Sequence, residues 1–287
     1  AYMAPSIASM ILIFTGNTKN SRIIGFLLAF LFLGLHLRAN HLQITYYLLF
    51  ILLAFWINYL YIFYTNNNII KFFKKTVLFC VAGVLAILIN IGNIWSTYEY
   101  SKYSVRGQSE LILNSENQTS GLDKDYATAW SYGIAETFTL LIPNFYGGAS
   151  QGKLTTDSET YKELRKRTSN AKQLIKQLPL YWGDQPFTSG PTYAGSIVIF
   201  LFVLGLLFVK SEMRIWLVMA TIMSIMLAWG KNFMGLTELF LDYFPAYNKF
   251  RAVSMILVIA EFTLPLLGFL ALNKFLFADK SEKEKKE

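Results

Sequence analysis

The polar residues best suited to chemistry form three groups in an otherwise apolar chain. The groups lie at residues 36–43, at residues 182–184 and at residues 230–251. Their guanidinium, ammonium, imidazole and amide groups suit recognition of an anionic phosphate, because such groups donate strong hydrogen bonds to phosphate oxygens. We therefore predict six substrate-binding residues, which are Arg38, His41, Gln43, Lys231, Lys249 and Arg251.

The first group leaves three interpretations open. Two histidines, His36 and His41, lie five residues apart. Zinc sites on a helix prefer a spacing of four residues and need further ligands, and no carboxylate is close in the sequence. A second interpretation is anchoring, in which the basic side chains reach the lipid headgroup layer. The third is phosphate recognition by Arg38, with His41 and Gln43 as hydrogen-bonding neighbours.

Three carboxylates are candidate supporting acids, and none is assigned as the catalytic residue. Glu261 lies inside the last apolar segment, where an acid is costly, so it either handles a substrate or ion or pairs with a basic group such as Arg251. Glu136 is either a water-facing residue or a site acid. Asp184 belongs to the second polar group. The motifs of nucleotide hydrolysis and of a serine nucleophile are missing.

The elements that must position these residues are apolar helices. Of the 287 residues, 54% are hydrophobic and 15% are charged, against about 25% charged in a soluble domain. The net charge of +8 comes mostly from residues 1–98, which contain no acid and keep their basic residues between long apolar runs. This pattern indicates a polytopic membrane protein and excludes a nucleic-acid partner. The single cysteine, Cys80, excludes a disulfide scaffold and a cysteine-rich metal site.

Seven segments approach the roughly 20 apolar residues that cross a bilayer. They are residues 3–15, 23–37, 44–64, 76–95, 193–209, 215–229 and 252–277. We therefore predict an all-α polytopic membrane protein with about seven transmembrane helices. Four of them, the first truncated, lie in residues 1–95, and three lie in residues 193–277. A large mixed extracytoplasmic segment occupies residues 96–192, and a charged cytoplasmic tail occupies residues 278–287.

The basic residues predict the orientation. Twelve of them fall in gaps on one side, and only four fall in short gaps on the other, namely Arg38, Lys231, Lys249 and Arg251. Because cytoplasmic loops keep Lys and Arg, we predict an N-terminus outside and a C-terminus in the cytoplasm of a bacterial inner membrane. All three polar groups then face the outer surface.

In the outer segment, residues 96–192, we expect an amphipathic helix over residues 126–142 and a polar helix over residues 156–178. The polar helix either packs on its neighbours or lies flat on the membrane.

Six strings occur in a characteristic order. They are AYMAP from residue 1, HLRANHLQITYY from residue 36, IPNFYGG from residue 142, YWGDQPFTSGP from residue 181, WGKN from residue 229 and FPAYNKFR from residue 244. Together they resemble the YfhO-like integral membrane family as found in Bacteroidota. The resemblance spans nearly the whole chain.

The resemblance implies the GT-C architecture of glycosyltransferases that use polyprenyl-phosphate-linked sugars. Such enzymes transfer a sugar to a cell-envelope glycan or polymer outside the cytoplasmic membrane, and often use a divalent metal. Members of the family are much longer, so we expect this chain to be a central part, inactive alone, with the catalytic acid before Ala1. A positive group should stabilise the leaving lipid phosphate, and Arg251 and Arg38 are the expected contacts.

Two other functions stay open. A transporter or flippase of a lipid-linked or envelope precursor is suggested by Glu261 and by Asn58, Asn90 and Asn93 within the apolar segments. It would need a hydrated path to both sides. A non-catalytic envelope scaffold is suggested by the long aromatic outer segment.

Overall fold

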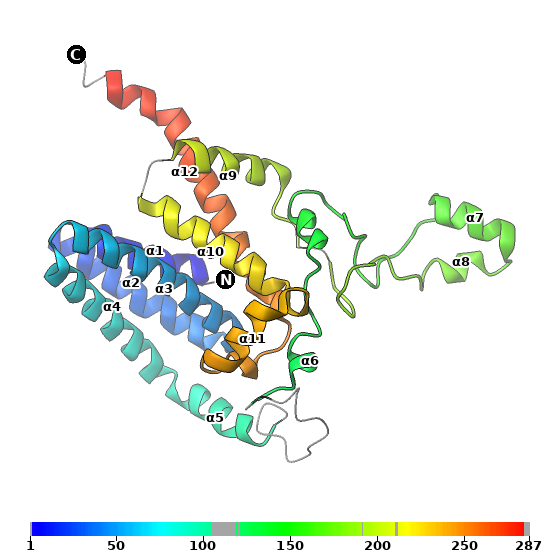
Figure 1. The fold of residues 1–287 in the computed structure, drawn as a ribbon, viewed down its shortest axis with the longest axis horizontal. Coiled ribbons are helices and arrows are strands. Elements are labelled where there is room, and N and C mark those ends of the chain that lie inside the picture. The colour runs from blue at the N-terminus through cyan, green and yellow to red at the C-terminus, as the bar shows by residue number, and fades with distance from the viewer. Residues whose placement is uncertain (1, 105–118, 120, 191, 210–211, 284–287) are drawn as a thin grey trace.

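The structure is a computed structural model that describes residues 2–104, 119, 121–190, 192–209 and 212–283, with side chains described up to residue 277. These residues form helices and connecting turns and no strand, with one isolated bridge between Gly147 and Tyr181 (Figure 1). The described part of the chain is therefore all-helical, as the sequence predicts.

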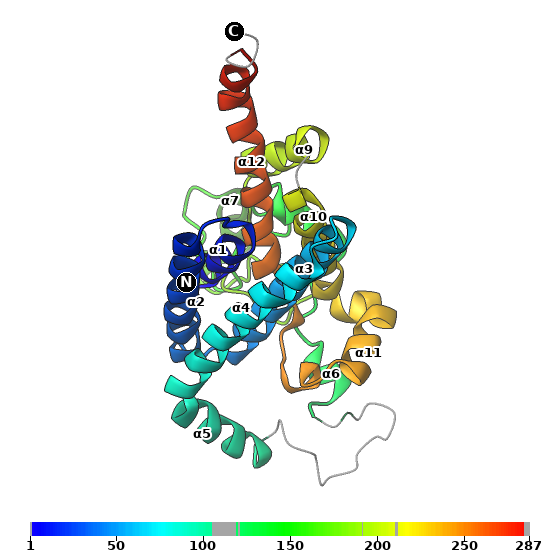
Figure 2. The same cartoon turned by 90° about the vertical axis from the view of Figure 1, so that its left-hand side faces the viewer.

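The N-terminal helices pack side by side and continue into a fifth that turns away from them (Figures 1 and 2). They are α1 (Met3–Thr15), α2 (Lys19–Arg38), α3 (Leu42–Thr65), α4 (Ile69–Ile89) and α5 (Ile91–Lys102). Thr18 caps α2 by accepting the Ser21 N–H, a typical helix start. Asn90, where α4 gives way to α5, donates from Nδ2 to the Gly34 carbonyl at 3.0 Å and so ties α4 to α2.

The C-terminal helices form a second group around the last helix of the chain. They are α9 (Ser196–Phe208), α10 (Glu212–Ala228), α11 (Met234–Tyr243) and α12 (Val258–Lys283). The α10 helix and residues 230–243 meet at a bend of 112°. Close packing holds α9 on α12, because a Cβ on Gly205 would lie 2.7 Å from Leu267 Cγ. The two groups meet where Trp216 of α10 packs on Phe55 of α3, with ring centroids 5.5 Å apart.

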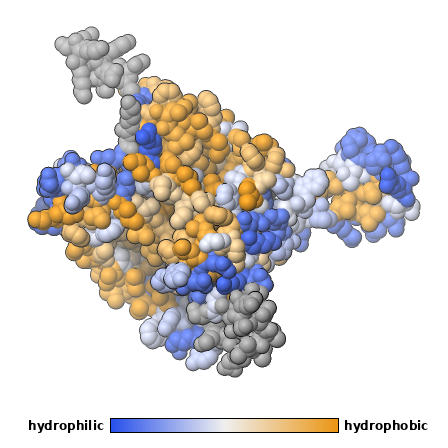
Figure 3. Space-filling model, in the orientation of Figure 1, coloured by the Kyte–Doolittle hydropathy of each residue, from blue (hydrophilic) through white to orange (hydrophobic). Residues whose placement is uncertain are grey.

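In the part of the chain that the structure describes, four helices are long and apolar enough to cross a membrane. They are α2, α3, α4 and the helix over residues 253–277, and the bent pair of α10 and residues 230–243 makes a fifth if counted as one span. The helices α1 and α9 have only 13 residues each. Each of the seven predicted segments nevertheless contains a helix. Apolar residues cover much of the visible surface of this helical part (Figure 3), as expected for contact with lipid.

The segment over residues 96–192 begins with the end of α5 and is otherwise built from short helices, not from the two longer ones that we expected. It contains α6 (Lys124–Ala127), a 3-10 helix over Ala135–Leu140, α7 (Glu159–Arg167) and α8 (Ala171–Leu174). The predicted helix over residues 126–142 is wrong, because the Tyr132 N–H donates to the Ala228 carbonyl at 2.8 Å and draws the chain onto the end of α10. The predicted helix over residues 156–178 is also wrong, since Thr168 adopts an extended conformation after α7. The α7–α8 pair projects away from the bundle (Figure 1).

Candidate functional site

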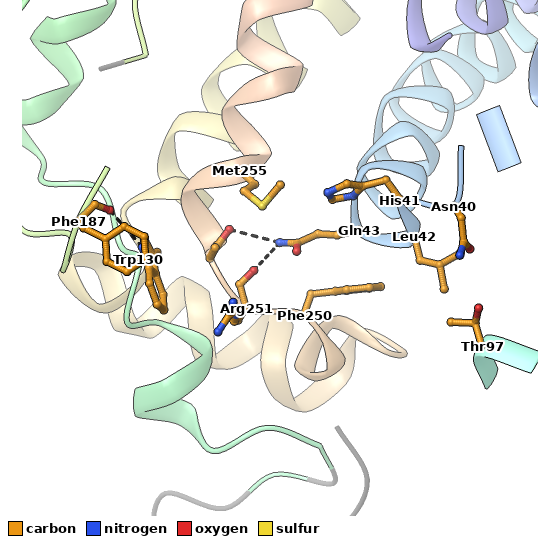
Figure 4. A pocket seen from close by; sticks show the side chains of 11 residues that line it. Asn40, His41, Leu42, Gln43, Thr97, Trp130, Phe187, Phe250, Arg251 and Met255 are labelled. Atoms are coloured by element: carbon orange, nitrogen blue, oxygen red, sulfur yellow. Dashed lines mark hydrogen bonds between the residues drawn. The ribbon is translucent and has the colours of Figure 1, made fainter. Parts of the chain in front are cut away.

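A cavity of about 440 Å³ opens where the turn between α2 and α3 meets the chain before α12 (Figure 4). Three of the six predicted substrate-binding residues line it, namely His41, Gln43 and Arg251. The remaining lining residues are largely apolar or aromatic, and are Asn40, Leu42, Thr97, Trp130, Phe187, Phe250, Ala252 and Met255. The structure thus brings together residues about 200 positions apart in the sequence.

Arg251 supplies the positive charge of the cavity. Its Nη1 donates to the Tyr126 hydroxyl at 2.7 Å, and its guanidinium lies 5.2 Å from the ring centroid of Trp130 and 5.7 Å from that of Tyr126. Guanidinium groups bind aromatic faces in this way. Among the described residues Arg251 belongs to no ion pair, so of the two alternatives for Glu261 its pairing with Arg251 does not form. Its charge therefore remains available to an anion.

Gln43 fixes the backbone that carries Arg251. Its side chain is buried, and its Nε2 lies within hydrogen-bonding distance of the carbonyls of Arg251, at 2.6 Å, and Ala252, at 3.2 Å (Figure 4). Ala252 has a φ of 60°, in the left-handed region that alanine rarely adopts. The amide of Gln43 is therefore engaged in holding this unusual turn, and the structure gives the residue a positioning role beside its place in the cavity wall.

His41 begins α3 and presents one nitrogen for a ligand. Its Nδ1 accepts the N–H of Ile44 at 3.4 Å, so the lone pair of Nδ1 is used as a helix cap. In the neutral ring, the proton then resides on Nε2, which is free to act as a donor. A helix cap and a ligand contact can thus be combined in one side chain.

The other predicted cations lie outside the cavity wall. Arg38 is exposed at the last turn of α2. Lys231 is exposed, and its backbone N–H donates to Ser131 Oγ at 2.8 Å. Lys249 ends a 3-10 helix over Tyr247–Lys249 and is partly buried. None of these three residues therefore lines the cavity with Arg251.

A buried carboxylate lies next to the cavity. Glu136 is only 2% exposed, and its two oxygens accept hydrogen bonds from the Gly133 N–H at 3.0 Å and from the Tyr181 hydroxyl at 2.8 Å. Asp184, whose Oδ2 accepts from Asn232 at 3.0 Å, also lies beside Gly133. A Cβ on Gly133 would be 3.2 Å from Asp184 Oδ2 and 3.5 Å from Glu136 Oε2. Two of the three candidate acids are therefore close neighbours.

Two tyrosines surround these acids. Burial raises the pKa of Tyr181 above its ordinary value, and the adjacent Glu136 raises it further, although the Gln185 N–H opposes the shift. Burial likewise raises the pKa of Tyr132; the neighbouring Thr139 side chain opposes this shift, and the charges of Glu136 and Glu261 add to it. The Tyr181 hydroxyl therefore stays protonated and donates a hydrogen bond to Glu136.

Gln185 connects the acids with the cavity. Its Nε2 donates to Glu136 Oε1 at 3.4 Å, and its Oε1 accepts from Ser254 Oγ at 3.2 Å, three residues after Arg251. Trp130 of the cavity wall donates from Nε1 to the Phe187 carbonyl at 3.2 Å.

The sequence analysis did not select Tyr126, Trp130 or Gln185 as site residues. Tyr126 and Trp130 fall in the predicted amphipathic helix over residues 126–142, where aromatic residues are expected to form its apolar face. The YWGDQPF string was the one signal that contained Gln185.

No metal site is evident in the described residues. No three of their His, Cys, Asp and Glu side chains lie close enough together to hold an ion. The divalent metal that the resemblance allows therefore finds no fitting ligand set in this part of the chain. Comparisons with protein-family models, with curated proteins and with solved structures found no match to this chain.

Proposed function

We propose that this chain is part of a membrane glycosyltransferase and that its cavity binds the phosphate of a polyprenyl-phosphate-linked sugar donor. The observation that carries this proposal is the placement of Arg251, whose guanidinium is held by Tyr126 and Trp130 in a cavity of about 440 Å³ and forms no ion pair with a described carboxylate. A fixed, unpaired cation is well suited to bind a phosphate.

The position of the cavity suits a lipid-linked ligand. It lies at the end of α3, which is long and apolar enough to cross a membrane. The end of such a helix reaches the headgroup level of a bilayer. A polyprenyl chain can then remain in the hydrocarbon core while its phosphate contacts Arg251. Under the orientation predicted from the basic residues, this is the extracytoplasmic face, where a cell-envelope acceptor is present.

The proposed transfer gives the positively charged groups and the carboxylates different tasks. An acceptor hydroxyl attacks the anomeric carbon of the sugar, the bond from that carbon to the phosphate oxygen breaks, and the electron pair leaves with the lipid phosphate. Arg251 and the Nε2–H of His41 stabilise the negative charge that develops on the phosphate. A carboxylate takes the hydroxyl proton. Both oxygens of Glu136 are already hydrogen-bonded, whereas the side chains of Asp184 and Glu261 are exposed.

The packing in the middle of the bundle favours this proposal over a transporter. A transporter needs a hydrated path between the two sides. In this structure the buried rings of Phe55, in the middle of α3, and Trp216 of α10 pack edge to face between the two cavities. A scaffold, for its part, has no need of an unpaired cation in a cavity.

The test is replacement of Arg251 in the full-length protein, with sugar transfer from a polyprenyl-phosphate donor as the measurement. We expect Arg251→Ala to lower kcat/KM by about 100-fold or more, as for loss of one transition-state donor. Arg251→Lys should recover part of the loss, because it keeps the charge but not the planar donor pair. The exposed Arg165→Ala on α7 is the matched control and should transfer normally. Normal transfer by Arg251→Ala would refute the proposed phosphate contact.

A further inference from the structure

A second cavity lies at the opposite end of α3 from Arg251. It has a volume of about 460 Å³, and its wall includes Phe14, Tyr59, Phe63, Asn66, Asn68 and Glu212. The α3 helix has 24 residues and is therefore about 36 Å long, enough to separate the two cavities by the thickness of a bilayer core. The second cavity is thus at headgroup level on the other face of the membrane.

The wall of this cavity has the composition of a cation site. Glu212 contributes a carboxylate that belongs to no ion pair of the described residues. Phe14, Tyr59 and Phe63 contribute aromatic rings, whose faces attract cations. Asn68 donates from Nδ2 to the Asn66 carbonyl, which leaves its own side-chain carbonyl as an acceptor. A primary ammonium, with three donors and one charge, matches a carboxylate, an amide oxygen and aromatic faces together.

A basic group lies beside the same wall. Lys75 donates from Nζ to the Phe14 carbonyl at 2.5 Å and to the Gly16 carbonyl at 3.4 Å, and its Nζ is 5.5 Å from the ring centroid of Phe63. These two carbonyls use two of its three protons. The third can be donated to an anion. Acidic and basic groups therefore flank one cavity, and a ligand that carries an ammonium and a phosphate a few bonds apart would satisfy both.

We propose that this cavity binds the headgroup of a zwitterionic phospholipid with a primary ammonium, of the phosphatidylethanolamine type. The ammonium contacts Glu212 between the aromatic rings, and the phosphate contacts Lys75. The lipid tails lie along α4, on which Ile70, Phe73 and Val77 are exposed. The proposal is independent of the role of Arg251, which lies at the other end of the bundle.

The test is lipid retention by the purified chain in detergent, measured by native mass spectrometry. The probes are dihexanoyl phosphatidylethanolamine, the phosphatidylglycerol and phosphatidylcholine of the same chain length, and free ethanolamine. We expect phosphatidylethanolamine to bind at least about tenfold more tightly than the other three. Glu212→Gln should remove that preference, and Phe63→Leu should weaken it. Glu163→Gln, an equal change of charge on exposed α7, should leave it intact.

Three results would overturn the proposal. One is an unchanged preference for phosphatidylethanolamine in both Glu212→Gln and Phe63→Leu. If one of these variants does not fold, an unchanged preference in the other is sufficient. Another is equal binding of phosphatidylglycerol or phosphatidylcholine, which would show that the ammonium or its protons are not recognised. The last is equally tight binding of free ethanolamine, which would identify the ligand as a soluble amine and not a lipid.

Discussion

Arg251 is restrained on several sides before any ligand arrives. Tyr126 and Trp130 contact its guanidinium, and Gln43 lies within hydrogen-bonding distance of its backbone carbonyl. An arginine that is already ordered loses less side-chain entropy when it binds, so more of the interaction energy is retained as affinity. The aromatic partners therefore contribute to phosphate binding without touching the phosphate.

Glu136 allows a test of the acid network at the level of one residue. Glu136→Gln replaces one acceptor oxygen by an amide that has to face either the Gly133 N–H or the Tyr181 hydroxyl, both of which donate in the native protein. We expect a loss of about 1–3 kcal/mol in unfolding free energy. Thermal unfolding in detergent measures this loss. The control Glu163→Gln, on an exposed pair with Lys166, should stay within about 1 kcal/mol of wild type. Equal stability of the two variants would contradict a structural role for Glu136.

At the residue level, polarity at the ends of apolar runs selected three residues that line one cavity, His41, Gln43 and Arg251, and their role in binding stays a prediction. This criterion missed Tyr126 and Trp130, because aromatic residues in a short amphipathic stretch are more often core than site. Their contact with Arg251 joins positions more than 120 residues apart, and no local pattern encodes it.

At the level of elements, each of the seven predicted apolar segments contains a helix, but in the described part of the chain only four helices, or five spans with the bent pair, are long and apolar enough to cross a membrane. The two helices expected within residues 96–192 were predicted wrongly. The α4 helix begins at Ile69 and ends at Ile89, whereas the prediction was residues 76–95. The chain at residues 128–134 is shaped by hydrogen bonds to the end of α10, such as Tyr132 N–H to Ala228. Long-range bonds of this kind are not visible in periodicity.

The packing of α9 on α12 can be tested with two glycines. A Cβ on Gly205 would lie 2.9 Å from the Leu267 carbonyl oxygen, whereas a Cβ on Gly83 of α4 would meet nothing within 4 Å. We expect Gly205→Ala to destabilise the protein by about 1–3 kcal/mol, because the two helices have to separate. Gly83→Ala should be neutral or stabilising by up to about 1 kcal/mol, since alanine favours a helix. Thermal unfolding of both variants makes the comparison, and a stable Gly205→Ala would show that α9 is not held by this contact.

At the level of the whole molecule, two helical groups meet along α3 and α10 and leave a cavity at each end of α3. The cavity at Arg251 combines a cation with aromatic rings, whereas the wall of the other cavity combines the carboxylate of Glu212 with aromatic rings and has Lys75 beside it. The two cavities therefore differ in the charged groups that they offer to a ligand.

Cysteine labelling tests the predicted orientation of the chain in the membrane. In a Cys80→Ser background, Ala39→Cys places a thiol in the turn between α2 and α3, and Asn17→Cys places one in the turn between α1 and α2. Both positions are exposed. We expect a membrane-impermeant maleimide to label Ala39→Cys in intact cells and to label Asn17→Cys only after permeabilisation. The reason is that the excess of basic residues predicts a cytoplasmic position for the turn that contains Asn17. The reverse pattern would invert the topology, and labelling of both in intact cells would show that α2 does not span.

The short length of α9 has a consequence for the surrounding lipid. Its 13 residues are about 20 Å long, while a bilayer core is about 30 Å thick, and Gly205 is its one buried residue. If α9 crosses a membrane, acyl chains meet a hydrophobic surface that is too short for them. The bilayer beside α9 would then thin, or polar groups would enter it, and either deformation costs a fraction of a kcal/mol per Å of mismatch. Shorter or more disordered lipids would accumulate on this flank, so the helix would sort the surrounding lipids through its length.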